Sequence, residues 1–522
     1  MKDWPDSLRR LSRPFIAVFI LLSTLLLFAL AGCVRPITSG DRNVPSENPQ
    51  NTETETPAVP GQTTDNKTVD LEITDPSNTP GETLFEPEAE NYFMIHTIEE
   101  GDTLGIIAEQ YETTMAEIMA LNQIANSDFI IIGETLRVPG PEFESLVGPS
   151  FEIIPDSELV YGPASKTFDL HTFTRQHEGY LLSHEEEVEG KVLSGTEIVQ
   201  LVADRHSVSP KLLLATLEYQ SKWLTDSQPT ETTYPLGYQE EDSSGLYKQL
   251  SWAANLLNWG YYGRAEGGMT SFLVNEEVPV TFAADIGYGT SGVQYYLASR
   301  DGINYEDWLL DVGPAGLFDT FSRLFEDPFK QETPSLIPDD LTQPPFALPW
   351  STGETWYFTG GPHGGWNTGS AWAALDFVPP NQVAGCSPSE NWVIAVADGV
   401  VSRSGQGAVV LDLDQDGYSG TGWAVTYMHL ADEDRAAVGS TVKTGDPLGH
   451  PGCEGGFTNG THVHLARTYN GRWISADGAL PFDLGGWISQ GEGYEYNGSL
   501  VRDGVIKTAD IYHTENNAIT AD

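Results

Sequence analysis

The sequence has few cysteines and few basic residues. Three cysteines in 522 residues exclude a disulfide-dense scaffold. Lys and Arg together number 26 against 75 Asp and Glu, which gives a net charge of −49. Phosphate would be repelled by such a surface, so nucleic acid is excluded as a partner. The length allows about two to four domains, and 13 Trp and 21 Tyr supply apolar mass for their cores.

The chain starts with basic residues, namely Lys2, Arg9, Arg10 and Arg13, followed by an uncharged apolar run over 15–31. This order is typical of a secretory signal, although the run is also long enough for a membrane anchor. The sequence Leu30-Ala31-Gly32-Cys33 resembles the bacterial lipobox, which implies that Cys33 is lipidated and becomes the first mature residue. We therefore expect residues 1–33 to be a lipoprotein signal peptide. The protein would be exported and attached to the membrane of the cell envelope through a lipid anchor.

Residues 34–91 are rich in Thr, Pro, Asn, Glu, Asp and Gly and poor in large apolar residues. Such a segment cannot bury enough surface to offset the entropy lost on ordering. We predict a disordered acidic tether, whose roughly 58 residues would give a root-mean-square reach of about 40 Å.

Residues 92–140 predict a compact βααβ unit. A strand over 93–98 precedes a turn and a helix with apolar residues at Leu104, Ile107 and Tyr111. Thr114 would cap a second helix, and a strand over 136–139 closes the unit. The matching pieces Gly101-Asp102-Thr103-Leu104, Leu121-Asn122 and Leu136-Arg137-Val138-Pro139 resemble the LysM family. That resemblance implies binding of N-acetylglucosamine-containing glycan, here peptidoglycan; the alternative is a small structural domain without a ligand.

Residues 150–340 predict a mainly helical domain, with helices over 195–204, 209–224 and the second half of 283–298. Residues 207–223 resemble the helix that carries the catalytic glutamate of lysozyme-like transglycosylases. Gln220-Ser221 stands where that family has Glu-Ser, and a glutamine cannot donate the proton that glycosidic cleavage needs. Glu218 lies on a different face of the helix. We therefore expect an inactive lysozyme-like domain or an ordinary helical core.

From about residue 345 to 515 the sequence predicts an all-β domain. Glycine becomes frequent, and strands are expected over 392–396, 400–404, 408–413 and 423–429. The predicted fold class is therefore multidomain α+β.

Six of the 11 histidines lie in this last third, namely His363, His429, His450, His462, His464 and His513. On a strand, His462 and His464 would point to the same face. Asp376 lies in the apolar run 373–377, where a carboxylate is costly to bury without a partner. A divalent cation is such a partner, whereas a lone His-x-His pair is more often solvated or structural.

This set resembles the M23 (LytM-like) metallopeptidases over roughly residues 350–480. The matching pieces include Leu375-Asp376-Phe377, Tyr427-Met428-His429-Leu430 and Gly460-Thr461-His462-Val463-His464-Leu465. The resemblance implies that His363, Asp376 and His464 bind Zn²⁺ and that His429 and His462 are catalytic. Three protein ligands leave zinc a fourth position for water, whose pKa falls to about 7.

One departure concerns His363, which lies 13 positions before Asp376, whereas the family keeps the two on one short motif. An inserted loop over 364–370 would explain the spacing; His450 and Asn367 are alternative ligands.

Cys386 and Cys453 either form a disulfide, worth roughly 4 kcal/mol in the chain-entropy model, or are two unrelated thiols. Asp412, Asp414, Asp416 and Gly417 resemble the start of a Ca²⁺ loop, but Trp423 replaces the required Glu, which favours a solvated hairpin turn.

We predict a zinc metalloendopeptidase that hydrolyses peptide bonds of peptidoglycan in cell-wall remodelling. The alternatives are a non-catalytic lipoprotein that regulates other wall hydrolases and a purely adhesive wall-binding protein. The metal content of the purified protein separates the first from the others. The sequence leaves open the cross-link that is cut, the membrane that holds the anchor and the oligomeric state.

Overall fold

All described residues belong to one part of the chain. The structure is a computed structural model, and it describes residues 93–98, 101–111, 113–115, 118–119, 122, 124, 130, 135–139, 145–240, 242–330, 335–380, 385–456, 458 and 460–522. Contacts divide the chain into residues 1–85 and 86–522. The predicted signal peptide, the lipidation site Cys33 and the predicted tether over 34–91 lie outside the described residues. Among the helices that are described, none has the length and apolar character needed to cross a membrane.

The first described unit has the predicted strand–helix–strand order. β1 (Phe93–Thr97) pairs antiparallel with β2 (Thr135–Pro139), and α2 (Leu104–Gln110) lies between them in sequence. The hydroxyl of Thr103 accepts a hydrogen bond from the Ile106 N–H and so begins the helix. A small core forms from buried residues on these elements, Ile98, Leu104, Ile107, Leu136 and Val138. The second helix expected after Thr114 is described only in part.

The middle region is helical with short strands, and its predicted helices are confirmed. The three are α7 (Gly195–His206), α8 (Pro210–Ser221) and α10 (Tyr288–Ala298). Ser194 and Glu197 form a reciprocal capping box at the start of α7, and Pro210 occupies the first turn of α8. The other elements are α4 (Asp156–Leu159), η2 (Pro163–Ser165), α5 (Leu170–His177), α6 (Tyr180–Ser183), α9 (Leu246–Ala265), α11 (Tyr305–Asp311), α12 (Leu317–Phe325), the hairpin β4 (Glu185–Val188) and β5 (Lys191–Ser194), and the sheet of β3 (Leu146–Val147), β7 (Val278–Thr281) and β6 (Ser271–Val274).

Glu218 on α8 has a structural role. Its carboxylate is buried and accepts hydrogen bonds from the backbone N–H groups of Leu224 and Thr225, at 3.0 and 3.2 Å. These bonds tie the end of α8 to the chain that follows it and leave the carboxylate fully engaged. The resemblance of this helix to lysozyme-like enzymes stays a prediction.

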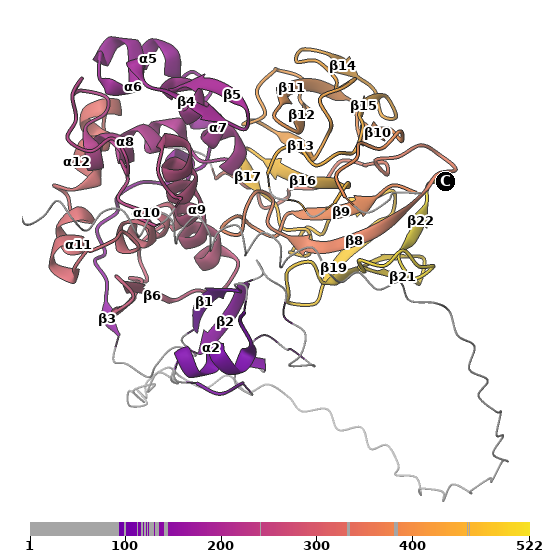
Figure 1. The fold of residues 1–522 in the computed structure, drawn as a ribbon, viewed down its shortest axis with the longest axis horizontal. Coiled ribbons are helices and arrows are strands. Elements are labelled where there is room, and N and C mark those ends of the chain that lie inside the picture. Colours follow the sequence, from indigo (N-terminus) through magenta and orange to yellow (C-terminus); the bar gives the residue numbers. More distant parts are fainter. Residues whose placement is uncertain are drawn as a thin grey trace, which may run out of the picture. The chain divides into compact units, whose positions relative to one another are not determined.

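The C-terminal region is built on a large antiparallel sheet, drawn in orange to yellow (Figure 1). The strands expected from the sequence are confirmed as β10 (Val393–Ile394), β11 (Gly399–Gly405), β12 (Ala408–Asp412) and β13 (Trp423–Met428). The sheet order is β14 (Thr441–Val442), β11, β12, β13, β16 (Val463–Tyr469), β9 (Ala374–Val378), β8 (Thr355–His363) and β22 (Ala518–Thr520), with β17 (Arg472–Trp473) paired to β16. The predicted all-β domain ended at residue 515, but β22 also belongs to it, because this last strand pairs with β8.

Smaller strands complete this region. β10 pairs with β15 (Pro447–Gly449), and a four-stranded sheet contains β18 (Asp483–Leu484), β19 (Trp487–Gly491), β20 (Gly498–Arg502) and β21 (Val505–Thr508). One face of the large sheet is covered by a buried apolar cluster that includes Trp356, Phe377, Val425, Tyr427 and Leu465. Because side chains alternate along a strand, the residues between these point to the opposite face. The described residues therefore have the predicted multidomain α+β fold. The candidate metal ligands His363, Asp376 and His464 lie on the central strands β8, β9 and β16.

Candidate metal centre

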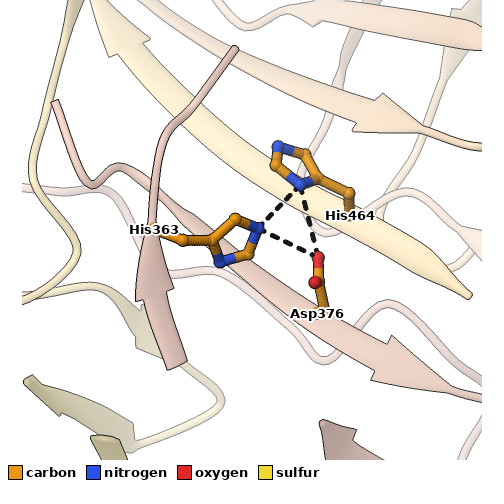
Figure 2. Close-up of side chains that lie close together, drawn as sticks. All are labelled: His363, Asp376 and His464. Carbon is orange, nitrogen blue, oxygen red and sulfur yellow. Dashed lines mark hydrogen bonds and ion pairs between the residues drawn. The ribbon is translucent and has the colours of Figure 1, made fainter. Parts of the chain in front are cut away.

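Three predicted ligands meet on the central strands of the large sheet. His464 on β16 is directly opposite Asp376 on β9, and His363 is the last residue of β8. Opposite residues in an antiparallel pair project to the same face, so the two side chains meet without any special loop. Figure 2 shows the three side chains pointing toward one another. They are 2, 8 and 6 % exposed for His363, Asp376 and His464, which makes the cluster a buried one.

Irregularities in β8 bring His363 to this cluster. The register between β8 and β9 shifts between Phe358 and Gly360 and again between Gly360 and His363. Such bulges change the direction of a strand and redirect its side chains. Gly360 pairs with Asp376, and a Cβ placed there would lie 2.7 Å from a carboxylate oxygen of Asp376. A glycine at 360 therefore leaves the space that the Asp376 carboxylate occupies.

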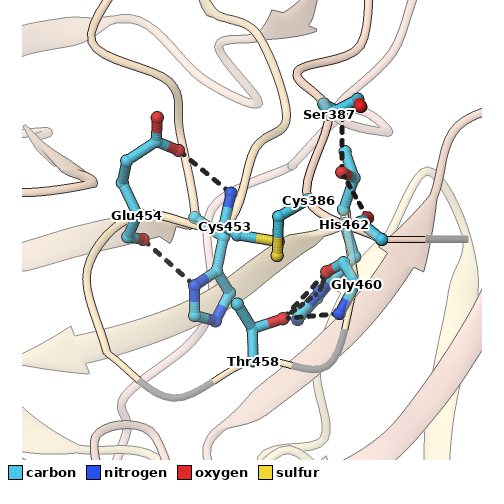
Figure 3. The surroundings of a disulfide bond; sticks show 10 residues. Cys386, Ser387, Cys453, Glu454, Thr458, Gly460 and His462 are labelled. Atoms are coloured by element: carbon cyan, nitrogen blue, oxygen red, sulfur yellow. Dashed lines mark hydrogen bonds between the residues drawn. A yellow bond between two sulfur atoms is a disulfide. The ribbon is translucent and has the colours of Figure 1, made fainter. Parts of the chain in front are cut away.

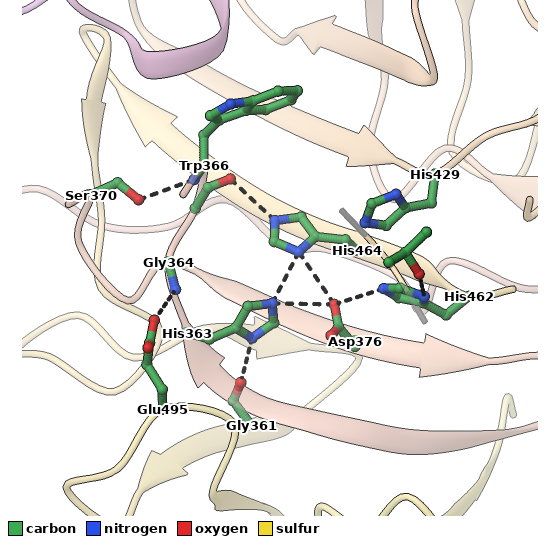
Figure 4. Close-up of polar contacts among 12 residues, drawn as sticks. Gly361, His363, Gly364, Trp366, Ser370, Asp376, His429, His462, His464 and Glu495 are labelled. Atoms are coloured by element: carbon green, nitrogen blue, oxygen red, sulfur yellow. Dashed lines mark hydrogen bonds and ion pairs between the residues drawn. The ribbon is translucent and has the colours of Figure 1, made fainter. Parts of the chain in front are cut away.

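The backbone fixes which nitrogen of each ligand histidine carries hydrogen. His363 Nδ1 is 2.7 Å from the Gly361 carbonyl oxygen, and His464 Nε2 is 3.1 Å from that of Gly365. A carbonyl oxygen can only accept, so both of these nitrogens are donors. In the neutral rings the opposite nitrogens, His363 Nε2 and His464 Nδ1, keep their lone pairs. These are the two nitrogens that face Asp376 (Figure 4).

The spacing of the three inward-facing atoms matches the ligand set of a tetrahedral metal. His363 Nε2 is 3.0 Å from His464 Nδ1, and each nitrogen is 3.3 Å from Asp376 Oδ1. Zinc bonds to imidazole nitrogen and carboxylate oxygen of about 2.0–2.1 Å place tetrahedral ligands about 3.3 Å apart. Asp376 Oδ1 is buried and accepts no hydrogen bond from the residues described. Lone pairs that converge in this way without a shared proton repel one another unless a cation lies between them.

The electrostatics of the cluster favour a positive charge at its centre. Burial raises the pKa of Asp376, but the neighbouring imidazoles of His363 and His462 outweigh it, and the net pKa lies well below the usual range. Burial lowers the pKa of His363, but Asp376 outweighs this effect and raises it overall. For His464 burial dominates and the pKa is lowered. The site thus keeps its carboxylate ionised and attracts either a proton or a metal ion.

The two predicted catalytic histidines lie beside this cluster. The ring centroids of His429 and His462 are 4.5 Å apart, and His429 is 6.0 Å from His464. His462 Nε2 is 3.7 Å from Asp376 Oδ1. His429 follows β13 with a φ of 63°, a left-handed conformation that a non-glycine residue adopts at some energetic cost. Burial and the neighbouring His462 and His464 hold the pKa of His429 well below its ordinary value.

Backbone carbonyls also orient this second pair. His429 Nδ1 is 3.1 Å from the Glu454 carbonyl oxygen, and His462 Nδ1 is 2.7 Å from that of Gly460. Both Nδ1 atoms are therefore donors, and both Nε2 atoms keep their lone pairs in the neutral rings. The sequence could not indicate these carbonyls, because every residue type has one. The sequence motifs therefore gave no indication of the tautomers of these histidines.

The alternative ligands considered from the sequence lie elsewhere. His450 packs against Trp392 with centroids 3.9 Å apart, and its Nδ1 donates to the Asn391 carbonyl. The side chain of Asn367 accepts from the Thr368 N–H. His450 is not in the group of His363, Asp376 and His464. Cys386 and Cys453 form a disulfide with Cα atoms 5.4 Å apart, so the open question about these cysteines is resolved in favour of pairing (Figure 3).

Asp412, Asp414 and Asp416 form a second group of oxygen ligands within 4.8 Å of one another. Their atoms are already engaged in a turn: Asp412 accepts from the Gly417 N–H, and Asp416 accepts from the Tyr418 N–H and forms an ion pair with Lys166. Burial and the neighbouring carboxylates raise the pKa of Asp412 to about 6. This geometry gives no support to the Ca²⁺ prediction and fits the hairpin turn that the sequence favoured.

Three family models match separate parts of the chain. Residues 96–139 match the LysM domain, residues 152–337 match the LasA N-terminal domain, and residues 384–476 match peptidase family M23. The last range contains His429, His462 and His464, whereas His363 and Asp376 precede it. The chain thus contains a LysM domain and an M23 peptidase domain, which confirms the two resemblances read from its motifs.

Two proteins of known sequence and one of known structure illustrate how much of the chain has relatives. Protease LasA of Pseudomonas aeruginosa is 25 % identical over 350 residues, covering 62 % of this chain and 75 % of that protein. The cortical fragment-lytic enzyme of Bacillus subtilis is 42 % identical over 46 residues, covering 9 % of this chain and 11 % of that protein. Among solved structures, the deep-sea M23 metalloprotease pseudoalterin is 28 % identical with a TM-score of 0.27, covering 33 % of this chain and 96 % of that one.

Proposed function

We propose that this chain, which carries a LysM domain and an M23 peptidase domain, is a zinc-dependent endopeptidase that hydrolyses peptide bonds of peptidoglycan. The observation that carries the proposal is the convergence of His363 Nε2, His464 Nδ1 and Asp376 Oδ1, spaced at 3.0–3.3 Å. Two of these atoms are imidazole nitrogens and one is a carboxylate oxygen, which is a donor set that suits zinc better than Mg²⁺ or Ca²⁺.

The chemistry divides between the ligands and the second histidine pair. A zinc ion held by His363, Asp376 and His464 would polarise the scissile carbonyl and lower the pKa of water toward 7. His429 and His462 are not needed as ligands, and each presents an Nε2 lone pair while its Nδ1 is held by a carbonyl. Either Nε2 can take the proton from the attacking water, and the imidazole protonated in this way can then return that proton to the leaving amine. The other ring can donate to the developing oxyanion only in its protonated form.

The low pKa of His429 suits the role of a base that is neutral at physiological pH. Its imidazole is buried beside two other imidazoles, so a proton on it is costly until a negative charge develops nearby. A neutral His429 can accept a proton without first losing one. Its strained backbone and its bond to the Glu454 carbonyl hold the ring in one orientation, which reduces the entropy lost on reaching the transition state.

The remaining parts of the chain suit a wall-associated enzyme. A LysM domain over residues 96–139 supports binding to the glycan of peptidoglycan. Lipidation of Cys33 would attach the protein to the membrane of the cell envelope, and residues 34–91 would give the folded part freedom to reach the wall.

The test uses the full chain purified with and without added Zn²⁺. Intact peptidoglycan is incubated with the protein, and the released fragments are identified by mass spectrometry. We expect new peptide amino termini that disappear when a chelator removes the metal and return when Zn²⁺ is restored. Equal release by zinc-loaded and chelated protein would contradict the proposal. Protein that binds no stoichiometric zinc and cleaves no wall peptide would favour the non-catalytic regulator.

A further inference from the structure

The disulfide lies between the segments that hold the two candidate catalytic histidines. Cys386 and Cys453 are 67 positions apart in sequence and are joined by a disulfide, whose surroundings include His462 (Figure 3). The backbone groups on both sides of Cys386 bond to Thr461, which precedes His462, and those on both sides of Cys453 bond to His429. The disulfide therefore connects two short segments, 385–387 and 452–454, at their midpoints.

The segment around Cys386 holds the residue that precedes His462. The Gly385 carbonyl accepts from the N–H of Thr461 at 3.1 Å and from its hydroxyl at 3.2 Å. The Ser387 carbonyl accepts from the same hydroxyl at 2.7 Å. Thr461 is only 2 % exposed, so these bonds are shielded from water. The position of the His462 backbone is thus set by carbonyls on either side of Cys386.

The segment around Cys453 holds His429 by two bonds. The Gly452 N–H donates to the His429 carbonyl at 2.5 Å, and the Glu454 carbonyl accepts from His429 Nδ1 at 3.1 Å. The Glu454 carboxylate folds back to accept from the Cys453 N–H at 2.9 Å. Gly452 also forms a bridge with His462. This segment therefore contacts both histidines and determines the orientation of the His429 ring.

The three candidate ligands are held in a different way. Asp376 and His464 are opposite one another on paired strands, and His363 ends the neighbouring strand. The carbonyls that orient the two ligand histidines belong to Gly361 and Gly365, which are not bonded to either disulfide segment in any interaction described for them. Strand pairing positions the ligands, whereas the disulfide spans the segments around the second pair.

We propose that the Cys386–Cys453 disulfide is a positioning element for His429 and His462, required for turnover but not for metal binding. The inference rests on the proposed peptidase function. With the disulfide broken, the two segments can separate, and the 4.5 Å spacing of the His429 and His462 rings is no longer fixed. A misplacement of about 1 Å in a catalytic group can reduce the rate by about 100-fold.

The first experiment reduces the disulfide in the zinc-loaded full chain. A water-soluble trialkylphosphine supplies two electrons to the S–S bond; the phosphorus takes oxygen from water, and the two protons of that water complete two thiols. This reagent is preferred to dithiols, which would compete for zinc. We expect kcat on a wall-derived peptide to fall about 10- to 100-fold, with zinc content unchanged and KM changed less than kcat. Reoxidation should restore kcat.

A second experiment leaves the disulfide intact and removes one of the bonds it supports. Thr461→Val has the same shape as threonine but lacks the hydroxyl that donates to the Gly385 and Ser387 carbonyls. Thr461→Ser keeps the hydroxyl. We expect kcat to fall in Thr461→Val, kcat to recover to a large extent in Thr461→Ser, and zinc content to be equal in the two variants.

The outcomes are separable from a failure of the proposed function. If oxidised, zinc-loaded protein cleaves no wall peptide, the peptidase proposal fails. If that protein is active and the reduced protein has the same kcat, the positioning role is overturned. Loss of zinc together with turnover on reduction would also overturn it, because the disulfide would then support the whole centre.

Discussion

Two groups of potential metal ligands lie in the C-terminal region, and they differ in what occupies their lone pairs. In the group of Asp412, Asp414 and Asp416, backbone N–H groups and the Lys166 ammonium already bind the carboxylates. In the group of His363, Asp376 and His464, the only hydrogens assigned to the rings point away from the centre, toward carbonyl oxygens. The first group is a satisfied turn, and the second is an arrangement that lacks a cation.

This difference shows that proximity of acidic or histidine side chains is a weak criterion for a metal site. Both groups fit within 4.8 Å. What separates them is the direction of their hydrogen-bond donors, because a donor that points into a cluster satisfies it and a donor that points away leaves the lone pairs for a metal. Substitutions in one group at a time test this difference.

The largest effect is expected for a ligand of the histidine group. His464→Ala should lose stoichiometric zinc, because two protein ligands remain and buried Asp376 loses one of its partners. Asp414→Ala changes the other group in the same domain and serves as the control. We expect it to retain zinc fully, as measured by elemental analysis after dialysis. Equal zinc in both variants would remove the distinction between the two groups.

A smaller effect on the metal, but a large one on turnover, is expected for His462→Ala. His462 Nε2 is 3.7 Å from Asp376 Oδ1, outside the three-atom group. The variant should keep zinc and lose about 100- to 10,000-fold in kcat, the range for removal of a general acid or base. Zinc analysis and peptide-release kinetics on one preparation would check both parts. Loss of zinc from this variant would place His462 among the ligands.

Gly360 offers a test of the space around the Asp376 carboxylate. A methyl group at this position would lie 2.7 Å from a carboxylate oxygen, so Gly360→Ala should displace the ligand and weaken zinc binding about tenfold, equivalent to about 1.4 kcal/mol. Gly405→Ala on β11 is the matched control, because a Cβ there meets nothing within 4 Å. Competition with a chromogenic chelator measures both affinities. Unchanged affinity in Gly360→Ala would show that the carboxylate is not held against this glycine.

The smallest expected effect is the pH dependence of zinc binding. Despite burial, Asp376 raises the pKa of His363 above its ordinary value. Zinc and a proton compete for this imidazole, because a histidine ligand must be deprotonated to bind a metal. The affinity for zinc should therefore fall as pH decreases through the raised pKa of His363, and binding should release a proton into the buffer. Calorimetry in buffers of different ionisation enthalpy measures this release. A zinc affinity that does not fall as the pH decreases would contradict the assignment.

The sequence predicted the parts of this fold that depend on local patterns. Short runs of strand-forming residues between glycine-rich turns indicated β11, β12 and β13 nearly to the residue, and the helix α7 was equally clear. The spacing of His462 and His464 indicated a shared face because strand geometry has a period of two. The apolar run 373–377 indicated that the Asp376 carboxylate needs a partner, and the family resemblance added His363 and the assignment of these residues with His464 as one ligand set.

Other features depend on contacts between distant residues and left no such pattern. The bulges of β8 that redirect His363 arise from its pairing with β9. The carbonyls of Gly361, Gly365, Glu454 and Gly460 fix all four histidine tautomers, but a carbonyl has no signature in sequence. Pairing of Cys386 with Cys453 was undecided because their separation of 67 positions says nothing about spatial distance.

The most direct test of the central claim is the zinc X-ray absorption spectrum of the full chain loaded with one equivalent of metal. We expect a four-coordinate ion with two imidazoles and oxygen ligands at about 2.0–2.1 Å, and a signal from one imidazole fewer in His363→Ala. Sulfur in the coordination shell, or a spectrum of only oxygen ligands that His363→Ala leaves unchanged, would contradict it.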